Sequence, residues 1–383
     1  MYYYVDHTSR FGRQTGIQRC VRSIAGALIG AGIPVRPVVW DRALADFTPA
    51  SSAALHHLVR WSGPAASQWS VPQPAQPHPT DQWLLIVELV SGPHQPSAHQ
   101  LRAAADRRGW RVAWIFHDAI PLRWAHLYGA GAAQTASHHA AYMAGLADFE
   151  LVLANSHTSA AHLRQFWRQR PCTPRHPVQA LPLAMELPAV PRLEAPSPLA
   201  AGQPLPILSV GSLEPRKNHR ALLKAVAALV AQGRFPAELV LVGWANDPQV
   251  VAMVRRALAL GLPLRWEADA EDQHLAELYR WCHFTVYPSL EEGFGLPVAE
   301  SLWLRRPCLC SGEGALGELA RAGGCLPVDS GDWRALASGL ERLLHEPALR
   351  QRLQAELHGR PLRTWATYAQ ELLQVLDQAS SSH

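Results

Sequence analysis

The 383-residue sequence has little charge, few cysteines and no long apolar run. Charged residues make up 17% and hydrophobic residues 48%, and this balance excludes an intrinsically disordered chain. No stretch approaches the roughly 18 uncharged apolar residues of a membrane span, and the N-terminus lacks the basic start of a signal peptide. We therefore expect a cytosolic protein.

The six cysteines form no CxxC pair and have no histidine at a zinc-ligand spacing. A zinc site or a disulfide framework is therefore not expected, and the cysteines should be thiols, mostly in the core. A convincing acidic DxD loop is also lacking, so we expect no metal. The net charge of +4 is too weak over this length to indicate nucleic-acid binding.

Strand and helix signals alternate along the whole chain, which predicts an α/β fold with parallel sheets covered on both faces. The length exceeds what one hydrophobic core usually supports, so two domains are expected. We place them at residues 1–187 and 205–358, with a proline-rich linker at 188–204 and a closing helical segment at 359–383. Residues 62–79 read as a long loop that could shape a binding site.

The most informative stretch lies at 289–300, Ser-Leu-Glu-Glu-Gly-Phe-Gly-Leu-Pro-Val-Ala-Glu. It follows a β-branched and aromatic run at 284–287 that predicts a buried strand. Pro297 should open a helix, and Leu296 before it has no side-chain acceptor to cap the first N–H groups. Those donors could receive a phosphate or a sugar oxygen. Glu292 in the loop and Glu300 in the first turn could accept hydrogen bonds from vicinal hydroxyls. Alternatively, Glu300 complements the helix dipole and Glu292 is merely solvated.

A second stretch lies upstream, where the apolar strand 206–210 ends in Gly-Ser-Leu-Glu-Pro-Arg-Lys-Asn at 211–218. Helical spacing follows, with Asn218 as its expected N-cap. Arg216 and Lys217 should then lie at the carboxyl end of a strand, where open α/β sheets bind their ligands. A guanidinium beside an ammonium suits a pyrophosphate. A basic pair that is only solvated is the alternative.

Together these stretches resemble the retaining GT-B glycosyltransferases of family 4. The resemblance implies two Rossmann-like domains facing each other across a cleft. The first should bind the acceptor and the second the nucleotide sugar, and a C-terminal helix within 359–383 should cross back onto the first domain. In that family the positions matching Arg216 and Lys217 bind the nucleotide diphosphate, the one matching Glu300 binds the ribose, and the one matching Glu292 contacts the transferred sugar. Main-chain N–H groups at positions matching 294–296 commonly meet the sugar or the phosphate.

The N-terminal half carries weaker resemblances. Residues 115–121 look like the family's strand-end His-Asp segment, and 151–156 like its later strand closing in Asn-Ser. Asp6 followed by Thr-Gly-Ile-Gln-Arg at 15–19 is similar to bacterial polysaccharide mannosyl- and rhamnosyltransferases. His117 could contact the donor or be a buried structural histidine. Gly16, capped by Thr15, could let the backbone approach the diphosphate, whereas Asp118 could simply fix a turn.

The candidate catalytic residues are His117, Arg216, Lys217 and Glu292. The candidate donor-binding residues are Gly16, Gly211, Arg216, Lys217, Glu292, Gly293, Phe294, Gly295, Leu296 and Glu300. The resemblance implies transfer of a hexose from a nucleotide diphosphate sugar, GDP-mannose or a related donor, to a saccharide or lipid-linked saccharide. We expect retention of configuration, a role in cell-surface polysaccharide synthesis and no cofactor. The alternative is a non-catalytic subunit that binds sugar nucleotides.

Two further patterns suggest other functions. Gly312-x-Gly-x-x-Gly317 matches a dinucleotide fingerprint, but Gly323-Gly324 limits the following helix to about two turns, so a dehydrogenase is the weaker enzyme alternative. Several arginines of the N-terminal half, interleaved with Leu163, Phe166 and Trp167, could lie against an anionic membrane. An ordinary amphipathic helix packed on the sheet is the alternative. The arginines are 102, 107, 108, 164, 168 and 170.

Overall fold

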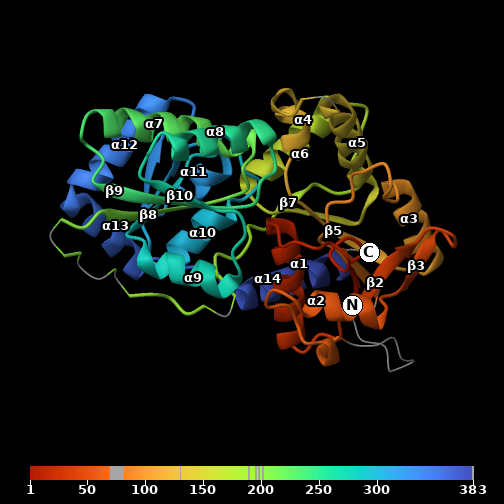
Figure 1. The fold of residues 1–383 in the computed structure, drawn as a ribbon. Coiled ribbons are helices and arrows are strands. Elements are labelled where there is room, and N and C mark those ends of the chain that lie inside the picture. Colours follow the sequence, from red (N-terminus) through yellow and green to blue (C-terminus); the bar gives the residue numbers. More distant parts are fainter. Residues whose placement is uncertain are drawn as a thin grey trace. The chain divides into compact units, whose positions relative to one another are not determined.

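The computed structural model describes residues 1–69, 82–129, 131–188, 190–194, 196, 199–200 and 202–381 (Figure 1). The chain forms two compact units, one made of Met1–Ala184 together with Arg363–His383 and the other of Met185–Leu362. The predicted linker, residues 188–204, belongs to the second unit in this division, and its Leu193 is buried in the core of that unit. The second unit also includes Leu187, which we had placed in the first domain. The division also ends the second unit at Leu362 instead of residue 358.

The described part of the first unit holds a seven-stranded sheet with the order β3-β2-β1-β4-β5-β6-β7. All neighbouring pairs are parallel except β2 and β3, which are antiparallel. The strands are β1 (Tyr2–Tyr4), β2 (Arg36–Asp41), β3 (Asp46–Pro49), β4 (Trp83–Ile86), β5 (Arg111–Phe116), β6 (Leu151–Ala154) and β7 (Gln179–Ala180). The helices are α1 (Gly16–Gly30), α2 (Ser52–Val59), α3 (Ala98–Arg107), α4 (Ile120–Arg123), α5 (Ala132–Gly145), α6 (His157–Arg168) and α14 (Trp365–Ser381).

The second unit holds a parallel sheet of six strands in its described residues, with the order β10-β9-β8-β11-β12-β13. The strands are β8 (Leu205–Val210), β9 (Ala237–Val242), β10 (Leu264–Glu267), β11 (Phe284–Tyr287), β12 (Cys308–Ser311) and β13 (Cys325–Val328). The helices are α7 (His219–Ala231), α8 (Pro248–Ala259), α9 (Asp272–Trp281), α10 (Leu296–Trp303), α11 (Gly314–Ala320), α12 (Trp333–His345) and α13 (Pro347–Gly359).

Helices cover both faces of each sheet, as the nearly continuous apolar strands require. In the second unit, α7, α8 and α12 pack on one face and α9 on the other (Figure 1). In the first unit, α3, α5 and α6 cover one face. Tyr3 of β1 donates from its hydroxyl to the Val21 carbonyl of α1 at 2.7 Å, and α1 in turn packs against α14. The predicted α/β fold with two parallel-sheet domains is confirmed.

Some elements differ from the sequence-based expectation. The edge strand β3 is antiparallel, and the periodicity gave no sign of β3, β7, β10 or β13. These strands have only two to four residues, too few to display a clear pattern. Of the predicted loop at 62–79, residues 70–79 lie outside the described residues, and its first part contains a short 3₁₀ turn, Ala66–Gln68.

The basic segment of α6 is a packed amphipathic helix, as the alternative interpretation held. Leu163, Phe166 and Trp167 are at most 6% exposed and belong to the core, so they are not available to a membrane. Within the described residues, no helix combines the length and apolarity that a membrane crossing needs. The six cysteines are free thiols, as predicted. Helix α11, which begins at Gly314 within the dinucleotide-like glycine motif, has only seven residues.

Candidate functional site

The predicted basic and acidic stretches meet at the switch point of the second sheet. Strand β9 lies on one side of β8 and strand β11 on the other, so the chain direction across the sheet reverses between β8 and β11. The loops after these two neighbouring strands leave the same carboxyl edge, and Leu290 N–H of one donates to Arg216 O of the other at 3.0 Å. Open α/β sheets bind ligands at this position.

A compact ionic cluster occupies this edge. The Glu292 Oε1 atom lies 2.7 Å from both the Arg216 guanidinium and the Lys217 Nζ, and Tyr287 donates its hydroxyl to the same oxygen at 3.1 Å. These ionic side chains are only 10–12% exposed. Glu214 accepts from the other guanidinium nitrogen of Arg216 at 2.7 Å. The two cations are therefore balanced by two carboxylates.

The second carboxylate oxygen of Glu292 is left for another partner. Within the part of the chain that the structure describes, no group bonds Oε2, because Arg216, Lys217 and Tyr287 all gather on Oε1. One oxygen thus organises the cations while the other can accept from a ligand hydroxyl. Glu292 was predicted to accept from a ligand hydroxyl, but the separate roles of its two carboxylate oxygens were not predicted.

Burial and charge shift the pKa values of the cluster in opposing ways. Burial raises the pKa of Glu292, but Arg216 and Lys217 outweigh that effect and bring it to about 2. Burial lowers the pKa of Lys217, and Glu292 opposes that shift. Burial also raises the pKa of Tyr287, so its hydroxyl keeps its proton and serves as a donor. The carboxylate is charged at neutral pH because two cations hold it.

Glycines bring the backbone close beneath this cluster. A Cβ on Gly211 would lie 3.5 Å from the Lys217 side chain and 3.7 Å from the Tyr287 ring, so the Gly211 backbone lies directly against the methylene stem of Lys217 and the Tyr287 ring. Gly243 has φ +156°, and a Cβ there would fall 2.0 Å from the Gly211 carbonyl oxygen. Only glycine fits at position 243, where the ends of β8 and β9 meet.

Helix α10 begins one residue earlier than predicted. Its N-cap is Gly295, with φ +97°, and not Leu296, although the absence of a side-chain cap is confirmed. Pro297 falls at the second helical position, and Glu300 lies beyond the first turn, which contains no acid. Glu300 is 2% exposed and accepts from the Tyr279 hydroxyl at 3.4 Å. Our placement of Glu300 in the first turn was therefore wrong. Gly293 and Phe294 are buried in the loop that precedes the helix.

Two predicted caps use their side chains differently. Asn218 occupies the N-cap position of α7 in a left-handed conformation, but its amide donates to the Ser330 carbonyl at 2.6 Å instead of capping the helix. Thr15 is the N-cap residue of α1, and its hydroxyl donates to the Gln18 side chain instead of accepting from a helix N–H. In both cases the position was predicted correctly and the hydrogen bond was not.

Gly16 and His117 belong to the first unit. Gly16 is the exposed first residue of α1. His117 follows β5, is 5% exposed and lies 2.5 Å through Nε2 from the Val87 carbonyl oxygen. Burial lowers the pKa of His117, so the ring is neutral and donates this bond. Asp118 accepts from the Ile120 N–H at 2.9 Å, which is the turn-fixing role named as its alternative.

Comparison with known proteins agrees with the geometry of the second unit. Residues 193–357 match the family described as Glycosyl transferases group 1. This segment is a group 1 glycosyltransferase domain. Over 146 residues the chain is 33% identical to O-antigen chain mannosyltransferase B of Escherichia coli, a match that covers 38% of each protein. Over 188 residues it is 33% identical to D-inositol 3-phosphate glycosyltransferase of Thermomonospora curvata, covering 46% of this chain and 43% of that protein. The matches thus span about two fifths of these relatives' length.

Solved structures extend the likeness to the whole chain. Sucrose-phosphate synthase from Thermosynechococcus elongatus aligns with a TM-score of 0.69 at 18% identity, covering 100% of this chain and 99% of that one. The Anabaena protein HepE, solved with UDP and glucose, aligns with a TM-score of 0.62 at 15% identity, covering 98% and 99%. The glycosyltransferase domain is therefore the second half of a GT-B fold, as predicted.

Three residues at or just after strand ends of the two sheets were not predicted from the sequence: Tyr287, Glu214 and Glu88. Tyr287 was taken as an ordinary strand residue, and Glu214 is one of many loop acids. Glu88 directly follows the apolar run that becomes β4, so the reasoning applied to Arg216 and Glu292 would have singled it out. It is 1% exposed, and burial raises its pKa to about 7 against the hydrogen bonds from the following loop.

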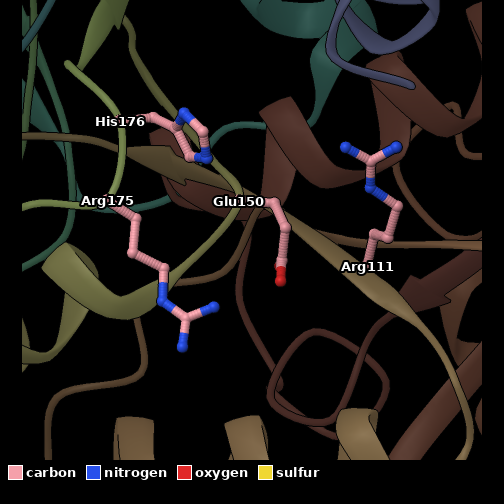
Figure 2. Close-up of a pocket in the computed structure, with 4 residues that line it drawn as sticks. All are labelled: Arg111, Glu150, Arg175 and His176. Atoms are coloured by element: carbon pink, nitrogen blue, oxygen red, sulfur yellow. The ribbon is translucent and has the colours of Figure 1, made fainter. Parts of the chain in front are cut away.

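A hollow of about 540 Å³ lies elsewhere, at the amino edge of the first sheet (Figure 2). It is lined by Arg111, Glu150, Arg175 and His176 and contains none of the predicted site residues. Arg111 is engaged by the Ala379 carbonyl and the Trp83 ring, and Glu150 by Arg102 and the Val112 N–H. The hollow therefore lies at the opposite edge of the sheet from the one where this fold binds ligands.

Proposed function

We propose that the protein transfers a hexose, with mannose as the favoured sugar, from a nucleotide diphosphate sugar to a saccharide or lipid-linked saccharide, with retention of configuration. GDP-mannose or a related donor fits the mannosyltransferase relatives. The proposed setting is the synthesis of a cell-surface polysaccharide, which the printed name of the E. coli O-antigen relative supports. The observation that carries the proposal is the cluster of Arg216, Lys217 and Glu292 at the switch point of a group 1 domain.

The two cations are suited to the leaving group. As the anomeric bond breaks, negative charge grows on the diphosphate, and fixed positive groups aimed at it lower the barrier. Arg216 and Lys217 are preorganised by Glu292 and Glu214, so binding of the diphosphate requires them to exchange carboxylate partners for phosphate oxygens. The uncapped N–H groups at the start of α10 add further donors. We propose that these groups, and no metal ion, stabilise the leaving diphosphate.

Glu292 has a separate part in this mechanism. Its Oε2 atom orients the transferred sugar by accepting from a hydroxyl, while Oε1 keeps the hydrogen bond from the Tyr287 hydroxyl. The sugar passes through an oxocarbenium-like state. The leaving phosphate takes the acceptor's proton on the same face, so no protein base is needed. Glu300, buried against Tyr279, is proposed to meet the ribose.

A Lys217→Met variant tests the assignment. The change removes the ammonium but keeps a flexible side chain of similar length, so transfer from GDP-mannose should fall at least about a hundredfold, as for loss of one transition-state donor. Lys224→Met is the matched control, because Lys224 lies on the exposed side of α7 near Trp333. Activity should also survive a metal chelator.

Wild-type turnover in Lys217→Met would contradict the proposal. A wild-type protein that binds nucleotides yet releases no diphosphate from any of the GDP-, UDP-, ADP- and CDP-sugars would instead identify the non-catalytic subunit considered above. Contact with an anionic membrane is a separate proposal that rests only on exposed arginines such as Arg164, Arg168 and Arg170. Co-sedimentation with anionic vesicles at low salt tests it.

A further inference from the structure

The first sheet has its own switch point, between β1 and β4. Strand β2 lies on one side of β1 and strand β4 on the other. The loop after β1 leads to α1, and the chain after β4 begins with Val87 and Glu88. These two segments share the carboxyl edge of the sheet, where a ligand of an open α/β fold is expected. None of the ionic cluster of the second unit belongs to this edge.

The buried Glu88 holds the loop after β1 by hydrogen bonds to its backbone. Its carboxyl group accepts from the His7 N–H at 2.8 Å and from the Thr8 N–H at 2.5 Å. The neighbouring Val87 carbonyl binds the His117 ring at 2.5 Å. One short segment after β4 therefore ties together the ends of β1 and β5. A buried acid satisfied by two main-chain donors gives this loop a single, well-defined conformation.

The same region fixes the His7 ring and its tautomer. The Thr15 hydroxyl bonds the Gln18 amide oxygen, and the Gln18 amide nitrogen lies 3.0 Å from His7 Nδ1. An amide nitrogen only donates, so Nδ1 is the acceptor and the ring proton resides on Nε2. Burial lowers the pKa of His7, which keeps the ring neutral at pH 7. Among the described residues, no group bonds Nε2–H.

Phe11 holds the other side of the ring. The two rings stack with centroids 4.5 Å apart and planes at 28°, and the Phe11 carbonyl is anchored by His57 Nε2 at 2.7 Å. Three separate contacts, from Glu88, Gln18 and Phe11, thus immobilise a partly buried imidazole whose Nε2 carries a hydrogen. Such support is typical of a side chain that must present one donor in a fixed direction.

The surroundings favour a neutral ligand. The nearby Arg10 is paired with Asp6, which also accepts from the Trp40 N–H at 3.2 Å. The His7 ring is neutral, its partner Gln18 is an uncharged amide, and Arg10 is paired with a carboxylate. A phosphate would find little compensation there, whereas a sugar hydroxyl accepts one hydrogen bond at little desolvation cost.

We propose that His7 binds a hydroxyl of the saccharide acceptor through Nε2–H, with Glu88 and Gln18 as its positioning residues. This inference rests on the proposed function, because it assigns the second substrate of the transfer to the first unit. His7 is a binding residue in this scheme and takes no proton from the acceptor.

Selective histidine NMR on the full chain tests the contact directly. The ring resonances of His7 should report the Nε2–H tautomer and shift saturably on adding one of the methyl α-glycosides of mannose, rhamnose, glucose or galactose. Concentrations up to about 100 mM cover the millimolar affinity expected of one sugar ring. Gln18→Leu should give a tautomer mixture. A His7 resonance that responds to none of the four glycosides overturns the inference, and so does a wild-type ring protonated on Nδ1.

Kinetics separate this inference from the proposed function. His7→Phe keeps the stack on Phe11 and removes the donor, so the acceptor KM should rise about five- to tenfold, the value of one neutral hydrogen bond, while donor hydrolysis stays within about twofold. His56→Phe is the control, because among the described residues the exposed His56 ring bonds the Ser52 carbonyl of its own helix and no other group. Transfer by wild type with an unchanged acceptor KM in His7→Phe refutes the His7 assignment alone. Absence of both hydrolysis and transfer in wild type refutes the function, and the NMR result then decides the site.

Discussion

Replacement of Glu292 by glutamine gives the sharpest test of the ionic cluster. The change keeps the shape of the side chain and removes the charge that faces Arg216 and Lys217. The pKa of Glu292 is about 2 in the folded protein against an ordinary value of 4.5, so its charged form stabilises the fold by about 3 kcal/mol at neutral pH. Loss of one partner from a buried ion pair typically costs a similar amount.

The effect must depend on pH in one direction. A depressed carboxyl pKa contributes stability that is complete above 4.5 and is lost as the pH falls toward 2. At pH 7 the Glu292→Gln protein should melt about 6–12 °C below wild type, since about 1 kcal/mol moves the Tm of a unit of this size by 2–4 °C. About half of that difference should have disappeared at pH 3.

Differential scanning calorimetry of both proteins between about pH 3 and pH 7 measures this. Because the two chains differ at one group, other acid-sensitive residues cancel in the comparison. A Tm difference that is the same at both ends of the range would show that the carboxylate is not held by the cations. GDP should raise the Tm of the variant more than that of wild type, because the diphosphate no longer competes with Glu292, while transfer should fall.

Further predictions follow from the same contacts. The raised pKa of Glu88, about 7, means that wild type loses stability as the pH rises from about 5 to about 8, because the buried carboxyl group must ionise. Glu88→Gln cannot ionise, so its free energy of unfolding should rise relative to that of wild type by about 2 kcal/mol over this range. Urea unfolding at the two pH values measures this change, and a difference that stays constant would refute it. Gly243→Ala should lower the free energy of unfolding by about 2 kcal/mol or more and weaken the rise in Tm that GDP causes, because its Cβ would fall 2.0 Å from the Gly211 carbonyl oxygen. Gly233→Ala is the control: its Cβ would meet no atom within 4 Å, so the rise in Tm with GDP should be unchanged.

The sequence predicted those parts of the molecule in which one local pattern controls the structure. The strand 284–287 has the predicted bounds, because four β-branched and aromatic residues buried on both faces leave little choice of register. The position of Arg216 and Lys217 after β8 followed from the strand and the proline-containing turn. Short edge strands such as β3 and β10 were missed because their side chains alternate over too few residues.

Other features depend on residues distant in sequence. Asn218 was a sound N-cap candidate by local rules, but the Ser330 carbonyl, 112 residues away, takes its amide. Leu296 was judged the cap because Pro297 follows it, whereas the left-handed backbone at Gly295 sets the start of the helix. The concentration of three donors on one oxygen of Glu292 requires Arg216 and Lys217, from the loop after β8, to meet Tyr287 at the end of β11. No spacing rule along the chain predicts such convergence.

The placement of α14 in the first unit bears on how the protein is made. Because that unit contains both Met1–Ala184 and Arg363–His383, the whole intervening unit leaves the ribosome before the first one can be completed. Until then the face of α1 that packs against α14 has no cover, and α14 itself buries Tyr368, Leu372 and Leu376 to at most 1% exposure in the finished protein. The nascent chain therefore carries an open apolar surface through most of its translation, and chaperones would have reason to hold it there.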